Sequence, residues 1–273
     1  MIVDIHAHAA GRLSSAQSIR ETAAKCNIEK ICLCTGPKNN LQLGPPPSMP
    51  LPKRPNSNYL LNRMLRFAYR RFLKDMGDGN SFVAELSQAV PDTIIPFLWV
   101  NPLDPKHLQD MTSNLERLRA KGIKLHQAWD AFSFDGSQFK TVAEIARPRS
   151  LPIFCHVYSR TQARKLLRFL LANRDVVFIV GHLAGLDVFK EYAAKLPNVY
   201  FDTSGSERIR VQDIQHAIDW FGCEHVLFGS DTPYAQIEVE VQKVDQLRIS
   251  DDHKDRIFKT NALEVLSRVT AST

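Results

Sequence analysis

Leu151-Pro-Ile-Phe-Cys-His156 and Val177-Phe-Ile-Val-Gly-His182 are the stretches that decide the fold. Each is a short apolar run that ends in a histidine. Such runs are typical of strands that are buried on both faces of a parallel sheet. An amphipathic stretch with helical spacing, residues 161–172, lies between the two, so the segment as a whole indicates a strand–helix–strand unit.

The same unit recurs in both directions along the chain. The pattern predicts eight strands, at residues 2–6, 30–35, 94–101, 122–127, 151–157, 176–182, 198–203 and 225–230. It predicts helices at residues 15–26, 105–120, 161–172 and 211–221. Asp104 as N-cap and Pro105 in the first turn support the start of the second helix. Eight such units are the number that closes a (β/α)8 TIM barrel. An open doubly wound sheet is the alternative, but no Gly-x-Gly-x-x-Gly follows the first strand.

Length and composition fit a single barrel domain over residues 1–273. Of the 273 residues 44% are hydrophobic and 23% are charged, which excludes intrinsic disorder and allows a large core. No apolar run approaches the roughly 20 residues that cross a bilayer, and the first residues lack the features of a signal peptide. The five cysteines form no Cys-x-x-Cys unit. We therefore expect a cytoplasmic protein without a membrane partner.

Residues 36–80 interrupt the alternation after the second strand. Six of the fifteen prolines lie within residues 45–55, which predicts an extended loop, and residues 58–75 have the spacing of a helix. An insertion at this point would rise from the carboxyl face of a barrel, where it could act as a lid. The alternative is a packing loop followed by a solvated helix. This segment has eight basic and two acidic residues, so its net charge of +6 equals that of the whole chain, which indicates an anionic small-molecule substrate if the segment covers the mouth.

Histidines are concentrated at the predicted strand ends. His6 and His8 end the first strand two residues apart, so they share one face and can bind one divalent metal. His156, His182 and Asp231 end the fifth, sixth and eighth predicted strands. The carboxyl ends of parallel barrel strands meet at one mouth, whereas a histidine of the core would show no preference for strand ends. The pattern therefore predicts a metal site at the mouth.

These motifs resemble the amidohydrolase superfamily over essentially the whole chain. Three of them, Gly122-Ile-Lys-Leu-His126, Gly181-His-Leu-Ala-Gly185 and Phe228-Gly-Ser-Asp-Thr-Pro233, are similar to the amidohydrolase-related branch that includes aminocarboxymuconate-semialdehyde decarboxylase. The resemblance implies a (β/α)8 barrel. It also implies four metal ligands, which here are His6, His8, His156 and Asp231, with His182 working beside the metal.

The fourth strand bears on the number of metal ions. Relatives with two metals carry a carboxylated lysine or a glutamate there, and TatD-like nucleases have the glutamate. Residues 122–127 contain no acidic residue, so we expect one metal, with zinc the first choice and Mn²⁺ the alternative. Lys124 and His126 share a face of this strand, and both are candidate substrate-binding residues. Carbamylation of Lys124 is the competing interpretation.

This site suits hydrolysis first. A bound metal lowers the pKa of its water, Asp231 can accept the proton, and His182 can polarise a carbonyl. We therefore expect a metal-dependent hydrolase of a small carboxylate-bearing amide, ester or lactone. The alternative is a metal-dependent non-oxidative decarboxylase of an aromatic or unsaturated acid, a lyase. Arg54, Arg160 and Arg208 are candidates for holding the carboxylate.

Two further predictions concern the surroundings of the site. Trp129 and Tyr158 follow the fourth and fifth strands and are candidates for an aromatic substrate pocket. The basic residues of 53–74 leave a remote alternative, a nucleic-acid-binding protein, which predicts steep salt dependence of binding. We expect no nucleic-acid partner, because apolar residues at core spacing interrupt the basic ones. Assembly into a homo-oligomer stays open.

Overall fold

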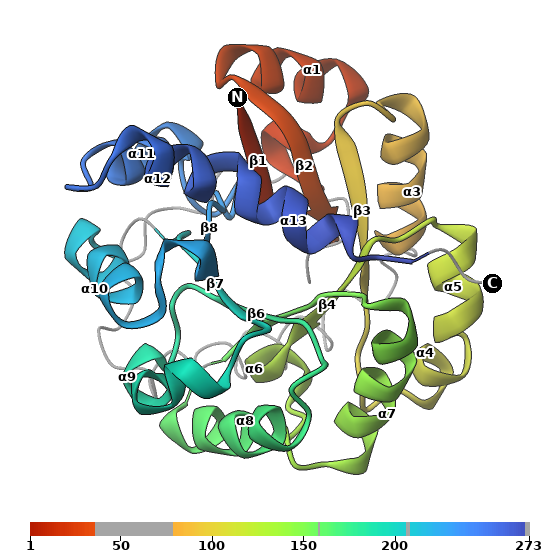
Figure 1. The fold of residues 1–273 in the computed structure, drawn as a ribbon. Helices are drawn as coiled ribbons and strands as arrows, with labels where there is room; N and C mark the ends of the chain where they lie inside the picture. The colour runs from red at the N-terminus through yellow and green to blue at the C-terminus, as the bar shows by residue number, and fades with distance from the viewer. Residues whose placement is uncertain (36–78, 158, 206–207, 271–273) are drawn as a thin grey trace.

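Eight parallel strands form one sheet in the order of the chain (Figure 1). The structure is a computed structural model, and it describes residues 1–35, 79–157, 159–205 and 208–270. The strands are β1 (Ile2–His8), β2 (Ile28–Cys34), β3 (Ile94–Trp99), β4 (Gly122–His126), β5 (Ile153–His156), β6 (Phe178–Gly181), β7 (Val199–Asp202) and β8 (Val226–Leu227). Every predicted strand is present.

The edges of this sheet meet between β1 and the residues that follow β8. Ile5 N donates to Phe228 O over 3.0 Å, Asp231 N to His6 O over 2.7 Å, and His8 N to Thr232 O over 2.8 Å. Although β8 itself is two residues long, the chain beyond it continues alongside β1. The predicted (β/α)8 TIM barrel is confirmed.

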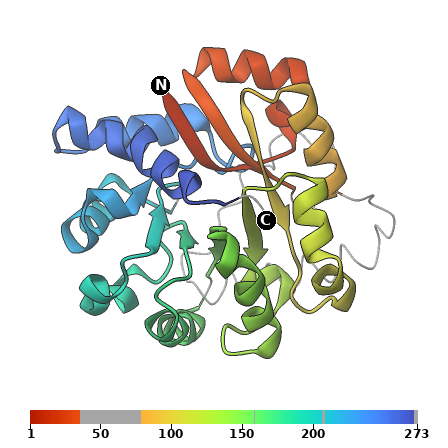
Figure 2. The same ribbon diagram turned by 45° about the vertical axis from the view of Figure 1, so that its right-hand side comes forward.

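Helices surround the barrel (Figures 1 and 2). They are α1 (Ala16–Lys25), α3 (Gly79–Ala89), α4 (Pro105–Gln109), α5 (Met111–Arg117), α6 (Gln127–Asp130), α7 (Ser137–Ala146), α8 (Arg160–Ala172), α9 (Leu186–Phe189), α10 (Val211–Phe221), α11 (Ile237–Asp245), α12 (Asp251–Asp255) and α13 (Asn261–Ser267). Short helical turns lie at Gly11–Leu13, Arg147–Arg149, Lys190–Lys195, Cys223–His225 and Arg256–Thr260. Within the described residues, no helix is long and apolar enough to cross a bilayer.

The predicted helix starts are correct, and one predicted helix is divided. Asp104 caps α4 by accepting from Lys106 N, and Ser15 caps α1 by accepting from Ser18 N. The single helix predicted over residues 105–120 is wrong, because Asp110 leaves the helical conformation (φ −90°, ψ 3°) and separates α4 from α5. The break turns the fully buried Met111 into the core. The insertion and its helix at 58–75 lie outside the described residues.

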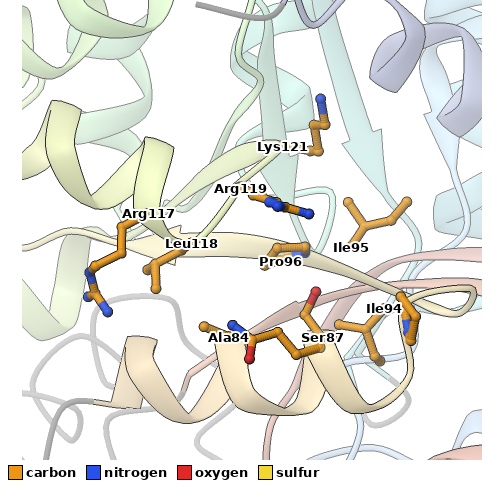
Figure 3. A pocket seen from close by; sticks show the side chains of 11 residues that line it. Ala84, Ser87, Ile94, Ile95, Pro96, Arg117, Leu118, Arg119 and Lys121 are labelled. Atoms are coloured by element: carbon orange, nitrogen blue, oxygen red, sulfur yellow. The ribbon is translucent and has the colours of Figure 1, made fainter.

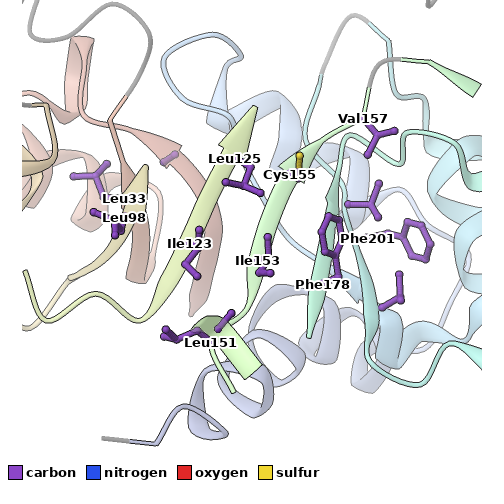
Figure 4. Close-up of a cluster of buried hydrophobic side chains, with 14 of the residues drawn as sticks. Leu33, Leu98, Ile123, Leu125, Leu151, Ile153, Cys155, Val157, Phe178 and Phe201 are labelled. Atoms are coloured by element: carbon purple, nitrogen blue, oxygen red, sulfur yellow. The ribbon is translucent and has the colours of Figure 1, made fainter. Parts of the chain in front are cut away.

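The outward faces of the strands pack against the helices (Figure 4). This layer is apolar because alternate residues of each strand point away from the barrel interior. Its members on neighbouring strands are Leu33, Leu98, Ile123, Leu125, Ile153, Cys155, Phe178 and Phe201. All of them are at most 2% exposed.

The interior of the barrel is apolar toward the amino ends of its strands. Phe97, Phe154, Ile179 and Leu227 form a buried cluster together with Ala262 and Val265 of α13. Three polar contacts hold α13 and the turn before it against the amino ends of the strands: Lys259 pairs with Glu29, Asn261 Nδ2 donates to Val226 O, and Arg268 donates to Asn198. The amino end of the barrel is therefore closed (Figure 1).

Candidate metal centre and active site

Three imidazoles converge inside the carboxyl end of the barrel. His6 and His8 come from β1 and His156 from the end of β5. His6 Nε2 lies 3.2 Å from His8 Nε2 and 3.3 Å from His156 Nε2. All three residues are at most 4% exposed. The structure thus brings together the three histidines that the sequence assigns to the metal.

Asp231 completes the group from the segment after β8. Its Oδ1 lies 3.3 Å from both His6 Nε2 and His8 Nε2. This oxygen is buried and accepts no hydrogen bond from the described residues. A buried carboxylate oxygen without a hydrogen-bond donor is costly unless a cation compensates it.

The other ring nitrogens fix the tautomers of His6 and His8. His6 Nδ1 lies 3.1 Å from Asp202 Oδ2, and His8 Nδ1 lies 3.1 Å from the carbonyl oxygen of Thr35. Both oxygens can only accept, so each Nδ1 carries the proton and donates it. In the neutral form of each ring, the lone pair of Nε2 is therefore turned toward the cluster. This arrangement is what metal-ligating histidines commonly have.

Lys124 reaches into the same cluster from β4. Its Nζ lies 2.6 Å from His6 Nε2 and 3.1 Å from His156 Nε2, and it stacks 3.9 Å above the ring of Phe154. Lys124 is 1% exposed, and burial lowers its pKa. The sequence indicates Lys124 as a candidate site residue. Its contacts with two candidate ligands depend on the length of its side chain, and the position of Lys124 on the strand does not predict them.

Burial sets the charge state of the cluster. Burial and the neighbouring Lys124 lower the pKa of His6 to about 3, and the same causes hold the pKa of His156 well below its usual value. Burial also opposes protonation of His8, but Cys34 and Asp231 outweigh it and raise the pKa of His8 to about 9. Burial works against ionisation of Asp231, yet the histidines around it, His6 foremost, lower its pKa.

The donor set fits a divalent metal ion. His6, His8 and Asp231 offer ligand atoms within 4.8 Å of one another, and so do His6, His156 and His182. Three imidazole nitrogens and one carboxylate oxygen are ligands that zinc accepts readily and that manganese also accepts. His6, His8, His156 and Asp231 would hold the metal, since an Asp231 oxygen without a hydrogen-bond donor faces the Nε2 lone pairs.

His182 stands beside the proposed ligands, directly after β6. Its Nδ1 is 3.0 Å from the carbonyl oxygen of Ser204, and its Nε2 is 3.8 Å from Asp231 Oδ2. Both His182 and Asp231 adopt left-handed backbone conformations, with φ of 58° and 53°. Such conformations are unfavourable for residues other than glycine and gather at functional sites.

Aromatic rings form one wall of the site. Trp99 stacks on His126 with ring centres 5.9 Å apart, and the ring of Tyr234 lies 5.0 Å from that of His8. Trp129 N donates to His126 Nδ1 over 3.0 Å, so the neutral His126 carries its proton on Nε2. Burial and Lys124 keep the pKa of His126 well below its usual value.

Sequence reasoning did not single out Trp99 or Tyr234. Trp99 is the last residue of β3, and a search for aromatic as well as ligating side chains at strand ends would have found it. Tyr234 follows the Asp231 turn, where the sequence pattern gives no signal.

Arg160 and Arg208 are the remaining predicted residues that the structure describes. Arg160 is 64% exposed on its side chain and pairs with Asp187 over 2.7 Å. Arg208 lies in the connection after β7, where its N donates to Gly205 O over 2.9 Å. Arg54 and Tyr158 lie outside the described residues, as does the proposed lid up to residue 78.

A separate groove of about 570 Å³ lies beside α3 and the start of β3 (Figure 3). It is bordered by Ile94, Pro96 and the basic residues Arg117, Arg119 and Lys121. Pro96 is the third residue of β3, and Lys121 directly precedes β4. The groove is therefore at the amino end of the barrel and contains none of the predicted site residues.

Comparison with known sequences identifies the family. The sequence profile of the family described as amidohydrolase matches residues 3–268. The chain belongs to the amidohydrolase family, as its strand-end motifs indicate. No curated protein matches the sequence significantly.

Solved structures with the same fold include three decarboxylases. The chain is similar to a 2,6-dihydroxybenzoate decarboxylase in complex with 2,6-dihydroxybenzoate (14% identity, TM-score 0.69, covering 98% of this chain and 99% of that chain). It is similar to a dihydroxybenzoic acid decarboxylase from Polaromonas sp. with bound manganese and the inhibitor 2-nitroresorcinol (16%, 0.70, 98% and 97%). It is also similar to 5-carboxyvanillate decarboxylase from Sphingomonas paucimobilis (16%, 0.64, 92% and 82%). At these identities the similarity establishes the fold.

Proposed function

We propose that this protein is a metal-dependent, non-oxidative decarboxylase of an aromatic carboxylic acid. The observation that carries the proposal is the buried cluster of His6, His8, His156 and Asp231 beside the aromatic wall of Trp99 and Tyr234. A metal-ligating cluster next to aromatic rings suits a flat substrate that carries an anionic group.

Decarboxylation replaces hydrolysis as the favoured reaction. The residues alone support both reactions, and hydrolysis is the first expectation from the sequence. The named decarboxylases among the similar structures support the alternative, since they cover nearly the whole chain. They act on aromatic acids, as their names state, and the aromatic wall is compatible with such a substrate.

Loss of CO₂ requires proton delivery to carbon. The bond between the ring carbon and the carboxylate breaks, its electron pair stays on the ring carbon, and one proton takes the place of CO₂. Asp231 and His182 are the titratable side chains that can hold this proton. Asp231 Oδ2 lies 3.8 Å from His182 Nε2, too far for a direct hydrogen bond, so the two residues would act on the substrate from neighbouring positions. A bound divalent metal would act as a Lewis acid that orients the substrate oxygens.

The remaining residues orient the reactants. His126 presents its Nε2 proton as a hydrogen-bond donor at the wall, because its Nδ1 accepts from Trp129 N. Ser204 holds the ring of His182 through its carbonyl oxygen, and Asp202 holds the ring of His6. We assign the metal as one divalent ion per chain. The bound manganese of the Polaromonas enzyme supports testing Mn²⁺ alongside zinc.

The test is a reaction panel with defined metals. Protein stripped with a chelator and dialysed is reloaded with Mn²⁺ or Zn²⁺, then incubated with 2,6-dihydroxybenzoate, 5-carboxyvanillate and a set of aryl lactones, esters and amides. We expect CO₂ release from an aromatic acid, with about one metal ion per chain by plasma mass spectrometry. Hydrolysis without CO₂ release, or full activity in the stripped protein, contradicts the proposal.

A further inference from the structure

A buried ion pair on α11 has no part in the site described above. Glu240 is fully buried and Lys243 is 7% exposed, and Lys243 Nζ lies 2.5 Å from Glu240 Oε2. Removing two charges from water costs several kcal/mol per ion before their attraction is counted. A well-packed apolar pair would often stabilise the fold equally well, so stability alone does not account for this ion pair. The polar contacts of Lys243 indicate its role.

Lys243 binds both ends of the connection between β7 and α10. Its Nζ donates to the carbonyl oxygen of Thr203 and to that of Ile209, each over 3.2 Å. Thr203 directly follows β7, and Ile209 lies two residues before α10. With Glu240 as its third partner, the ammonium group ties together two points six residues apart.

This connection holds two histidines of the site. Ser204 N donates to Asp202 Oδ1 over 2.9 Å and Ser204 Oγ donates to Asp202 Oδ2 over 2.6 Å, so Ser204 fixes the carboxylate that orients His6. The carbonyl oxygen of Ser204 accepts from His182 Nδ1 over 3.0 Å.

The next residue confirms how closely the connection packs. A Cβ atom on Gly205 would lie 3.3 Å from His182 Nδ1, and its φ of 114° is one that residues with side chains rarely adopt. The backbone at Gly205 thus lies directly against the imidazole. A shift of the connection would move the His182 ring with it.

We propose that Lys243, held by Glu240, is a positioning residue that sets the orientation of His182 and, through Ser204 and Asp202, of His6. The role rests on the proposed function for its catalytic readout, while its structural readout is independent of any substrate. Because Lys243 touches only the carbonyl groups of the connection and Glu240 among the contacts described, it acts through the backbone rather than on the substrate.

Four variants separate this role from a contribution to stability alone. Lys243→Met leaves Glu240 buried without its partner and is expected to destabilise the fold, so Glu240→Met/Lys243→Met is the informative variant. Lys243→Arg keeps the cation opposite Glu240 and tests rescue. Arg256→Met, which removes an exposed cation paired with Glu264 at the amino end of the barrel, is the control.

Hydrogen exchange provides the readout that needs no substrate. In the double variant we expect the amides of Ser204, Arg208 and Ile209 to exchange at least tenfold faster than in the wild type, while the amides of β4 and β5 are unchanged. All three amides donate hydrogen bonds within this connection or to Asp202. Unchanged exchange in a folded double variant overturns the proposal.

Kinetics with the metal-loaded enzyme provide the second readout. With 2,6-dihydroxybenzoate or 5-carboxyvanillate, whichever the wild type decarboxylates, we expect kcat of the double variant to fall 10- to 100-fold. With Mn²⁺ at saturation KM should change less than threefold, and Lys243→Arg should recover part of kcat. A loss that Arg256→Met reproduces, or an unchanged kcat, contradicts the proposal. If the wild type releases no CO₂, the proposed function fails while hydrogen exchange still decides the role of Lys243.

Discussion

The two ends of the barrel interior differ in chemistry although the same strands build both. At the amino end Phe97, Ile179 and Leu227 pack against α13. At the carboxyl end the interior holds ionisable side chains, and on β5 a single step along the inner face leads from Phe154 to His156. Residues at the amino end of the barrel therefore stabilise the fold, while residues at the carboxyl end of the same strands form the candidate site.

Replacing Asp231 at the carboxyl end is expected to have the largest effect. Asp231→Asn removes the negative oxygen that faces His6 and His8 and one member of the proton-transferring pair. We expect kcat to fall at least about 1000-fold, equivalent to about 4 kcal/mol, with little change in the unfolding midpoint. Decarboxylation assays and urea denaturation measure the two effects. Asp92→Asn, an exposed aspartate at the amino end, is the matched control; equal losses in both variants would remove the distinction.

A cavity at the amino end should have the opposite signature. Ile179→Ala removes a fully buried side chain from the apolar cluster, which costs about 2–5 kcal/mol in unfolding free energy. We expect kcat per folded molecule to stay within threefold of the wild type. Urea denaturation combined with activity at low temperature tests this. A large fall in kcat of the folded variant would show that the two levels are coupled.

Gly181, the last residue of β6, tests how tightly the carboxyl end is packed. A Cβ atom there would lie 2.6 Å from His156 Cδ2 and 3.0 Å from Phe154 Cε1. Gly181→Ala should therefore displace the His156 ring, and we expect metal affinity to fall about 10- to 100-fold, as when the support of a ligand is lost. Titration with Mn²⁺ by calorimetry measures the change. Unaltered affinity would show that His156 is not a ligand.

The smallest effect is expected from a charge that stands near the carboxyl end but outside the site. Asp213 accepts from Arg210 N and from the guanidinium of Arg210, and these contacts lower its pKa. Asp213→Asn should cost about 0.5–1 kcal/mol of stability at pH 7. A carboxyl group whose pKa is lower in the folded protein stabilises it above its unfolded pKa of about 3.9.

The difference between wild type and Asp213→Asn should therefore vanish as the pH falls below that value through the folded pKa. Urea denaturation at pH 7, 5 and 3 measures this change. A difference that is undiminished at pH 3, or a change in kcat, would contradict the assignment of Asp213 to stability alone.

The barrel and the members of the cluster were predictable because both follow from local patterns. A run such as residues 151–156 predicts a strand without help from the rest of the chain. The last residue of that strand then lies at the carboxyl edge of the sheet. Five such positions on four strands then have to meet, since the carboxyl ends of barrel strands share one mouth. The alternation of side chains along a strand also predicts that His6 and His8 face the same way. In the structure their Nε2 atoms are 3.2 Å apart.

The details that sequence could not supply depend on side-chain reach and on contacts between distant segments. Lys124 sits one inward position below His126, yet its length brings Nζ to the histidines. The backbone carbonyl oxygen of Thr35 accepts a hydrogen bond from His8 Nδ1. Every residue has such a carbonyl group, so the sequence does not reveal this contact. The break at Asp110 spans a single residue, which the helical period does not resolve. Lys243 lies on an outer helix about 40 residues from the loop that it binds.

The closure of β1 against the segment after β8 also has a consequence for synthesis of the chain. His6 and His8 are synthesised before their partner Asp231 and the residues that pair with β1, which follow more than 220 positions later. Contacts of such large sequence separation slow folding, because a long loop must close before they form. One edge of β1 therefore stays unpaired until the segment after β8 has been synthesised. A nascent chain that ends just before Asp231 already contains β1 to β7 but lacks the fourth proposed metal ligand.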